Sequence, residues 1–197
     1  MAFIVTSQTG LSFMDVSQLI KNARLGNAAS QKCLFDLFSD KMMLVCRRYL
    51  KNPEDAEEVL LDGFYKFFKT LSSFHYLGEA SLYGWLKKIM INESLMTLRK
   101  RNVFTIIIES DAEDIQLEEE ALNNLSAKEI FELIIQLPVG YRTVFNLYVI
   151  EGMDHKEIAT LMGIAEGTSK SQLSKAKSLL QKKLLQNGTG YFKRKSQ

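Results

Sequence analysis

Apolar residues recur every three or four positions over most of this 197-residue chain, which is the period of an amphipathic α-helix. In the first hundred residues the pattern predicts four helices, near residues 12–26, 28–51, 53–72 and 79–101. Alternating runs typical of β-strands are nearly absent. The exception is a β-branched run at 103–108, which we interpret as a packed linker piece rather than a strand. We therefore expect an all-α fold.

The third predicted helix has the clearest start. Asn52 is a good N-cap, Pro53 suits the first helical position, and two acids follow near the positive end of the helix dipole. Apolar side chains along the second and third helices are numerous enough for this block to fold around its own core. They are Leu34, Phe35, Phe38, Met42, Val45, Tyr49, Val59, Phe64, Phe67, Phe68 and Leu71.

A second helical block begins near Ser126, where Ser126 and Glu129 have the spacing of a capping box. Asp154 and Glu157 repeat that spacing, and Gly163 ends the short helix that they begin. A second helix follows at once. The pair has the layout of a helix-turn-helix, a motif that places its second helix in the major groove of DNA.

The second helix of this motif has two distinct faces. Leu173, Ala176 and Leu180 form a buried stripe that extends back to position 169. The opposite face presents hydroxyls, which suit close approach to base edges, and lysines, which attract phosphates. These residues are Gly167, Lys170, Ser171, Ser174 and Lys175. The alternative is a helical hairpin whose lysines are only solvated.

Charge divides the chain into three parts. Residues 1–100 carry 13 basic and 10 acidic side chains, residues 101–125 carry one and seven, and residues 126–197 carry eleven and six. Blocks of like charge are typical of linkers and tails. We therefore expect two small helical domains at 1–101 and 126–187, an acidic linker at 102–125, and a basic flexible tail at 188–197.

Aromatic and basic side chains alternate after the third helix. Phe74 and Tyr76 lie in a loop, and Trp85, Lys87 and Lys88 follow it. Such a combination can stack unpaired bases while the lysines hold phosphates. The alternative is that Phe74 and Trp85 belong to the core, which is the commoner place for a large apolar side chain.

Composition argues against several kinds of site. Cys33 and Cys46 lie far apart within apolar helical patterns, so we interpret both as buried thiols. His75 and His155 have no ligand set around them, so we expect no metal site and no cofactor. No segment has the apolar length to cross a bilayer and the first residues lack a basic leader, so we expect a cytoplasmic chain.

Two parts of the chain resemble the same protein family. The stretch LPVGYRTVFNLYVIEGMDHKEIATLMGIAEGTSKSQLSKAKSLL resembles the promoter-reading C-terminal domain of bacterial extracytoplasmic-function sigma factors. The stretches YLKNPEDAEEVLLDGF and GWLKKIMINESLMTLRK, with the aromatic loop between them, resemble the N-terminal domain of the same family. Two matches in the right order are far more specific than either one.

The resemblance implies a transcription initiation factor, not an enzyme, that joins core RNA polymerase and directs it to promoters. The acidic helix would dock on the polymerase clamp through Asp55, Glu57, Glu58 and Leu61. The second helix of the helix-turn-helix would read the minus-35 element through Lys170, Ser171, Ser174 and Lys175. The acidic linker would thread towards the RNA path of the polymerase. The family also implies an anti-sigma factor as a partner.

The resemblance assigns the minus-10 element to the aromatic loop and the fourth helix. The loop would capture a flipped base, and the helix would lie along the element and help to melt it. The residues concerned are Phe74, Tyr76, Trp85, Lys87, Lys88, Asn92, Arg99, Lys100 and Arg101.

Four positions depart from the family pattern. Ser169 replaces an apolar residue of the buried stripe, Ala165 replaces a capping Ser or Thr, and Gln172 stands where Arg is common. Leu61 stands where the clamp-binding helix usually carries Gln. Three of these four substitutions lie in the helix-turn-helix that is expected to read the minus-35 element.

Two other functions remain alternatives. A conventional helix-turn-helix regulator would need a sensing or phosphorylation module in the first block, where the sequence instead matches clamp and promoter contacts. An enzyme is a more distant alternative, because the chain shows no nucleophile with a base, no phosphate loop and no metal cluster. We expect no small-molecule substrate and no membrane insertion.

Overall fold

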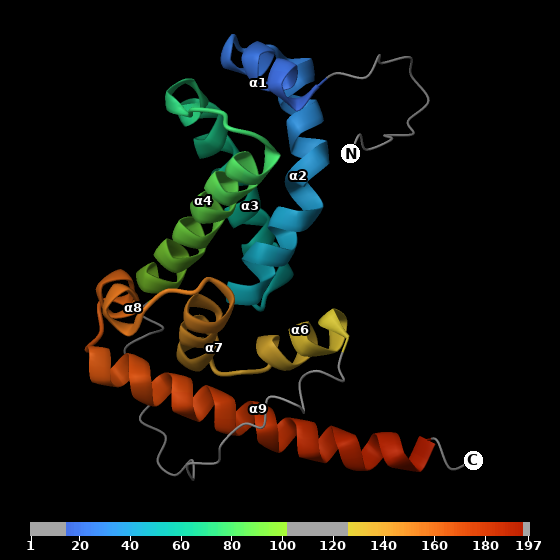
Figure 1. Cartoon of the computed structure of the whole chain (residues 1–197), viewed down its shortest axis with the longest axis vertical. Helices are drawn as coiled ribbons and strands as arrows, with labels where there is room; N and C mark the ends of the chain where they lie inside the picture. The colour runs from blue at the N-terminus through green and yellow to red at the C-terminus, as the bar shows by residue number, and fades with distance from the viewer. Residues whose placement is uncertain (1–14, 102–125, 195–197) are drawn as a thin grey trace.

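The computed structural model describes residues 15–101 and 126–194 and shows two helical modules (Figure 1). The N-terminal module contains α1 (Val16–Arg24), α2 (Ala28–Tyr49), α3 (Pro53–Thr70) and α4 (Glu79–Lys100), with a single 3-10 turn, η1 (Leu71–Ser73), after α3. All four predicted helices are present. The described residues contain no β-strand, and the run at 103–108 lies outside them.

Side-chain caps fix the starts of the long helices. The Asn52 side chain accepts a hydrogen bond from the Asp55 backbone N–H at 2.9 Å, and Pro53 occupies the first turn. The Asn27 side chain accepts from the Ser30 N–H in the same way and begins α2. The predicted cap of α3 is therefore confirmed.

The core of the N-terminal module lies where α2, α3 and α4 face one another. Tyr49, Phe67, Met42 and Leu86 are fully buried within it. α3 and α4 approach closely at Gly63, where an added Cβ atom would collide with the sulfur of Met90. Of the predicted core residues, Phe35 and Phe68 are only partly buried. They lie near the edge of the aromatic cluster around Phe64.

The two cysteines have different surroundings. Cys46 is fully buried, and burial raises the pKa of its thiol to about 12. Cys33 is only partly buried, so its prediction as a buried thiol was wrong. It lies one position away from the buried stripe of α2 that contains Leu34.

The C-terminal module contains α6 (Ala127–Ile135), α7 (Val139–Phe145), a wide turn η2 (Asn146–Ile150), α8 (His155–Met162) and α9 (Glu166–Arg194). Both predicted capping boxes form, at the starts of α6 and α8. Figure 1 shows α9 as a long helix across the face of this module that lies away from α2 and α4. The helix continues beyond residue 187, so most of the segment expected as a flexible tail is helical.

The two modules touch at the C-terminal end of α2, whose last carbonyls have no partner within the helix. Arg142 of α7 is 4 % exposed, and its Nη2 donates to the Tyr49 carbonyl at 2.8 Å. Asn146 Nδ2 donates to the Arg48 carbonyl at 2.9 Å. The C-terminal module therefore supplies the C-cap of a helix in the N-terminal module, with a cation at its negative end.

Arg142 is also bonded within its own module. Its Nη1 donates to the carbonyls of Ile135 and Leu137, each at 3.1 Å. Burial lowers the pKa of Arg142 to about 10, so the guanidinium remains charged at neutral pH. Arg47 of α2 adds a further contact between the modules, with its guanidinium carbon 5.9 Å from the ring centroid of Phe131.

In the part of the chain that the structure describes, no helix combines the length and the apolar character of a membrane span.

Candidate nucleic-acid interface

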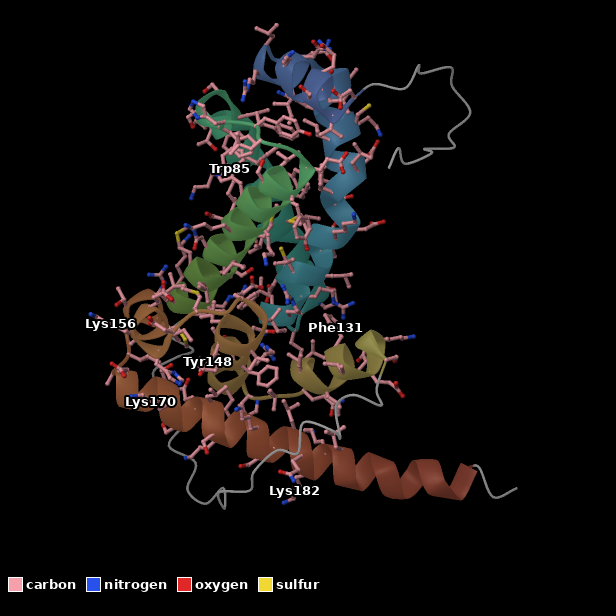
Figure 2. The ribbon with its side chains drawn as sticks, viewed as in Figure 1. Trp85, Phe131, Tyr148, Lys156, Lys170 and Lys182 are labelled. Carbon is pink, nitrogen blue, oxygen red and sulfur yellow. The ribbon has the colours of Figure 1, made fainter. Side chains whose placement is uncertain are left out.

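The α8–α9 pair forms the predicted helix-turn-helix. Gly163 adopts the left-handed conformation, with φ of 68°, and this ends α8 and lets α9 begin at Glu166. Lys156 lies in the first turn of α8 and Lys170 near the start of α9; both are labelled in Figure 2. Both side chains are exposed.

The predicted recognition residues are accessible to differing degrees. Lys170, Ser171 and Ser174 are exposed, and Lys175 is half-buried. Lys170 makes an ion pair with Glu166 at 2.7 Å, one turn earlier in the same helix. Because its side chain is 60 % exposed, this pair is weak, and a phosphate can replace the carboxylate.

The unusual serine at position 169 has a partner inside the module. Ser169 is fully buried in the stripe that was expected there, and its Oγ lies 2.9 Å from Nδ1 of His155. The His155 ring in turn stacks on Tyr148, with ring centroids 4.6 Å apart. This contact joins the start of α8 to the start of α9, so Ser169 helps to set the angle of the second helix.

Gln172 does not face the open side of α9. Its side chain is half-buried against Gly140 of α7, where a Cβ atom would lie 3.2 Å from the amide oxygen of Gln172. Ala165, in contrast, is exposed just before α9 begins. Gln172 therefore packs between α9 and α7 instead of standing on the open face of α9.

One face of α4 is an exposed polar strip, which we call the α4 strip. Lys88, Asn92, Met96 and Arg99 follow one another at intervals of four, four and three residues, and all are exposed. Lys100 and Arg101 extend the basic character at its end. Met96 is 38 % exposed and was not predicted. An apolar side chain exposed between cations is the feature that indicates a DNA contact here, because such a side chain can contact a thymine methyl group.

Lys87 is not part of the α4 strip. It is half-buried on another side of the helix, and its Nζ lies 2.6 Å from Oε2 of Glu151 in the C-terminal module. The predicted minus-10 residues are therefore separated by the structure: the strip faces solvent, whereas Lys87 faces the other module.

The aromatic residues belong partly to the core. Phe74 and Trp85 stack in parallel, with centroids 4.4 Å apart and an interplanar angle of 4°. Trp85 also packs against Phe67, with ring centroids 5.2 Å apart. Both stacked residues are half-buried and lie against the core, as the alternative interpretation of the sequence required. In Figure 2 Trp85 lies on the part of the N-terminal module away from α6 and α9.

The loop after η1 is held at both ends. Arg24 of α1 donates to the carbonyls of Leu71, at 3.2 Å, and of Phe74. At the other end Ser81 donates to the Gly78 carbonyl at 2.7 Å and accepts from the Leu77 N–H at 3.1 Å. Arg24 was not predicted, because nothing near it in the sequence indicates a partner about fifty residues away.

Between these anchors, the loop exposes two side chains that were not predicted to contact DNA. His75 is exposed, and Leu77 is 87 % exposed. Tyr76 is half-buried, and burial, with the nearby carboxylates of Asp15 and Glu79, raises the pKa of its hydroxyl. The loop therefore combines fixed ends with an open middle, a form suited to receiving a planar ligand.

The clamp-docking residues predicted on α3 also have different surroundings. Glu57 and Glu58 are exposed, and Leu61 is 54 % exposed. Asp55 instead forms an ion pair with Arg101, with one hydrogen bond of 2.8 Å, and this pairing lowers the pKa of Asp55. Two residues assigned to different surfaces thus meet each other. Tyr65, one turn after Leu61 and 67 % exposed, was not predicted.

The described residues contain no group of three or more side chains suited to holding a metal ion. Three surface features of the described residues are candidates for an interface, namely the polar faces of α4 and α9 and the half-apolar face of α3. Each of these can recognise a macromolecule.

Comparison with known proteins identifies the family. Residues 34–103 match the model of sigma-70 region 2, and residues 120–180 match the model of sigma-70 region 4. The RNA polymerase sigma-H factor of Pseudomonas aeruginosa is 27 % identical over 180 residues, covering 85 % of this chain and 92 % of that protein. The ECF RNA polymerase sigma-E factor of Haemophilus influenzae is 25 % identical, covering 84 % of this chain and 93 % of that protein.

A solved structure is also similar. It is that of the sigma factor RpoE in complex with the anti-sigma factor NepR from Bartonella quintana, with a TM-score of 0.46 and 25 % identity. The match covers 79 % of this chain and 96 % of that one. Both family models and the relatives' names agree, so this chain belongs to the extracytoplasmic-function family of RNA polymerase sigma factors.

Proposed function

We propose that this protein binds core RNA polymerase through α3 and directs it to promoters with two separate DNA-binding surfaces. The α4 strip and the loop at 74–78 take the minus-10 element, and α8–α9 takes the minus-35 element. The observation that carries this proposal is the presence of two exposed polar helix faces on two modules of one chain. A single helix-turn-helix regulator needs only one of them.

The α4 strip suits a strand that is being opened. Lys88 and Arg99 attract phosphates from positions about three turns apart along α4. Asn92 between them offers both a donor and an acceptor to a base edge. The loop at 74–78 lies at the start of the same helix, where His75 and Leu77 are open to an unstacked base.

The exposed part of α3 suits a protein partner. Leu61 and Tyr65 lie one turn apart with Glu57 and Glu58 beside them, so an apolar centre has an acidic rim. We assign this surface to the polymerase clamp. An anti-sigma factor that covers the same two apolar side chains would prevent docking, and we propose such a partner for this chain.

The test uses purified core polymerase and a pool of promoter fragments. The chain is expected to bind core polymerase and to start transcripts at a defined set of promoters that share two upstream motifs. Lys88→Ala with Arg99→Ala should weaken opening of the minus-10 region, read by the fluorescence of 2-aminopurine placed in that element. Lys21→Ala with Lys128→Ala, two exposed changes on α1 and α6 that remove the same charge, is the matched control.

The outcomes separate the candidate functions. Binding to duplex DNA without binding to core polymerase would favour a conventional regulator. Recovery of polymerase alone from the native cell would argue against a dedicated anti-sigma factor. The proposal assigns no covalent chemistry to the chain and places it in the cytoplasm, where RNA polymerase works.

A further inference from the structure

Met96 is an apolar side chain on an otherwise polar helix face. It is 38 % exposed and belongs to the α4 strip, together with Lys88, Asn92 and Arg99. Because an α-helix turns by about 100° per residue, these four side chains fall within an arc of about 80° around α4. Met96 therefore lies on the same side of the helix as the cations of the strip.

The immediate neighbours of Met96 on the helix surface favour an anionic partner. Arg99 and Lys100 lie three and four residues after it, and both are exposed. The acidic neighbour, Glu93, lies three residues before it but is buried, and its Oε1 lies 2.6 Å from Nζ of Lys66. The carboxylate of Glu93 is therefore already neutralised, and the surface around Met96 attracts negative charge.

An apolar side chain among cations suits DNA better than a protein surface. A protein interface gathers several apolar side chains at its centre, as Leu61 and Tyr65 do on α3. The structure describes α4 over its whole length, and this helix exposes no large apolar side chain other than Met96. DNA offers phosphates to the cations, and the C5-methyl group of thymine is the apolar feature of its base edges in the major groove.

The methyl group of thymine is available both before and after the DNA opens. It projects from C5, away from the atoms that pair thymine with adenine, so separation of the strands does not remove it from reach. Methionine has an unbranched and polarizable side chain, which adapts to a partner that changes position. Cytosine has no such group at C5, so contact with the methyl group distinguishes the two pyrimidines.

We propose that Met96 is a specificity-determining residue, which selects thymine at one position of the minus-10 element through the C5-methyl group. This inference rests on the proposed function, because it requires the α4 strip to lie on that element. The cations of the strip hold phosphates of any sequence, whereas Met96 adds a preference for one base.

The first test changes the DNA by one methyl group at a time. In a promoter selected from the pool, each thymine of the minus-10 region is replaced in turn, on either strand, by deoxyuridine, which lacks only the methyl group. At one position this should lower the affinity of the chain bound to core polymerase about three- to fourfold, the factor for one buried methyl-sized group. At that position 5-methylcytosine, paired with guanine, should be bound more tightly than cytosine by about the same factor.

The second test repeats both comparisons with variants of the protein. Met96→Ala should abolish the two methyl preferences, whereas Met96→Leu, which keeps an apolar side chain of similar size, should retain them. Leu44→Ala is the matched control, because Leu44 is 56 % exposed but lies on α2 and not on α4. The control should show the same methyl preferences as wild type.

The outcomes separate this inference from the proposed function. Promoter opening without a methyl preference at any thymine, or a preference that survives in Met96→Ala, would overturn the role of Met96 and leave the proposed function intact. Weaker binding of Met96→Ala to core polymerase, with the methyl preference unchanged, would place Met96 in a protein interface instead. If the chain neither binds core polymerase nor selects promoters, the proposed function fails and the inference fails with it.

Discussion

Replacing Arg142 with methionine tests whether the buried guanidinium stabilises the fold. Methionine keeps the apolar length of the side chain but donates no hydrogen bond, so the carbonyls of Tyr49, Ile135 and Leu137 lose their donor. Hydrogen bonds from a charged donor contribute about 1.5–3 kcal/mol each, so the three bonds together contribute about 4–9 kcal/mol. Loss of these bonds is the destabilising part of the change.

The charge itself has a burial cost that the substitution removes. Burial lowers the pKa of Arg142 from 12.5 to about 10, and this corresponds to a cost of about 3 kcal/mol for the charged form. The difference predicts that Arg142→Met lowers the free energy of unfolding by about 3 kcal/mol. For a chain of this size the melting temperature should fall by about 6–12 °C.

The assay is urea unfolding followed by circular dichroism, with Arg99→Met as the control. Arg99 lies exposed on α4, so the same chemical change there should alter stability by less than about 0.5 kcal/mol. Arg142→Lys should be intermediate, because an ammonium group keeps the charge but lacks the planar fork that reaches three carbonyls. If Arg142→Met unfolds at the same urea concentration as wild type, these bonds do not stabilise the folded state.

Three further predictions concern single contacts. Arg24→Ala should reduce minus-10 opening several-fold in the 2-aminopurine assay, because the loop at 74–78 loses its anchor. Lys21→Ala on the same helix should leave opening unchanged. Equal losses for the two variants would refute the role of Arg24 in holding the loop. Ser169→Ala should lower stability by about 1 kcal/mol by removing the partner of His155, whereas Ser169→Val restores an apolar stripe; thermal melting of both checks this. Asp55→Asn should cost about 0.5 kcal/mol at pH 7. Because the folded-state pKa of Asp55 is lowered, that difference should persist down to pH 3.8 and vanish as the pH falls through the folded-state pKa. A difference that is already lost well above pH 3.8 would contradict this.

The helices were predictable because their signals are local. Caps such as Asn52 and Asp154 act within three residues, and the apolar stripe of a helix repeats within one or two turns. The burial of position 169 followed from the same periodicity even though serine occupies it. The exposed face of α9 was predictable for the same reason.

The pairing of charges was not predictable, because it depends on contacts between distant segments. Arg142 and Tyr49 are 93 residues apart in the sequence, and no local pattern connects them. Lys87 and Lys88 are neighbours of the same type, yet one faces Glu151 and the other faces solvent. Sequence reasoning therefore located the two helices of the candidate site but could not tell which of their cations are already neutralised.

The parallel stack of Phe74 and Trp85 makes the chain its own spectroscopic reporter. Trp85 is the single tryptophan of the whole sequence, and it lies at the base of the loop proposed to receive a flipped base. Indole emission is sensitive to the ring stacked on it and to the water around it. When only the indole is excited, so that the seven tyrosines do not contribute, the fluorescence of the unlabelled protein therefore reports the state of this one loop while DNA is added.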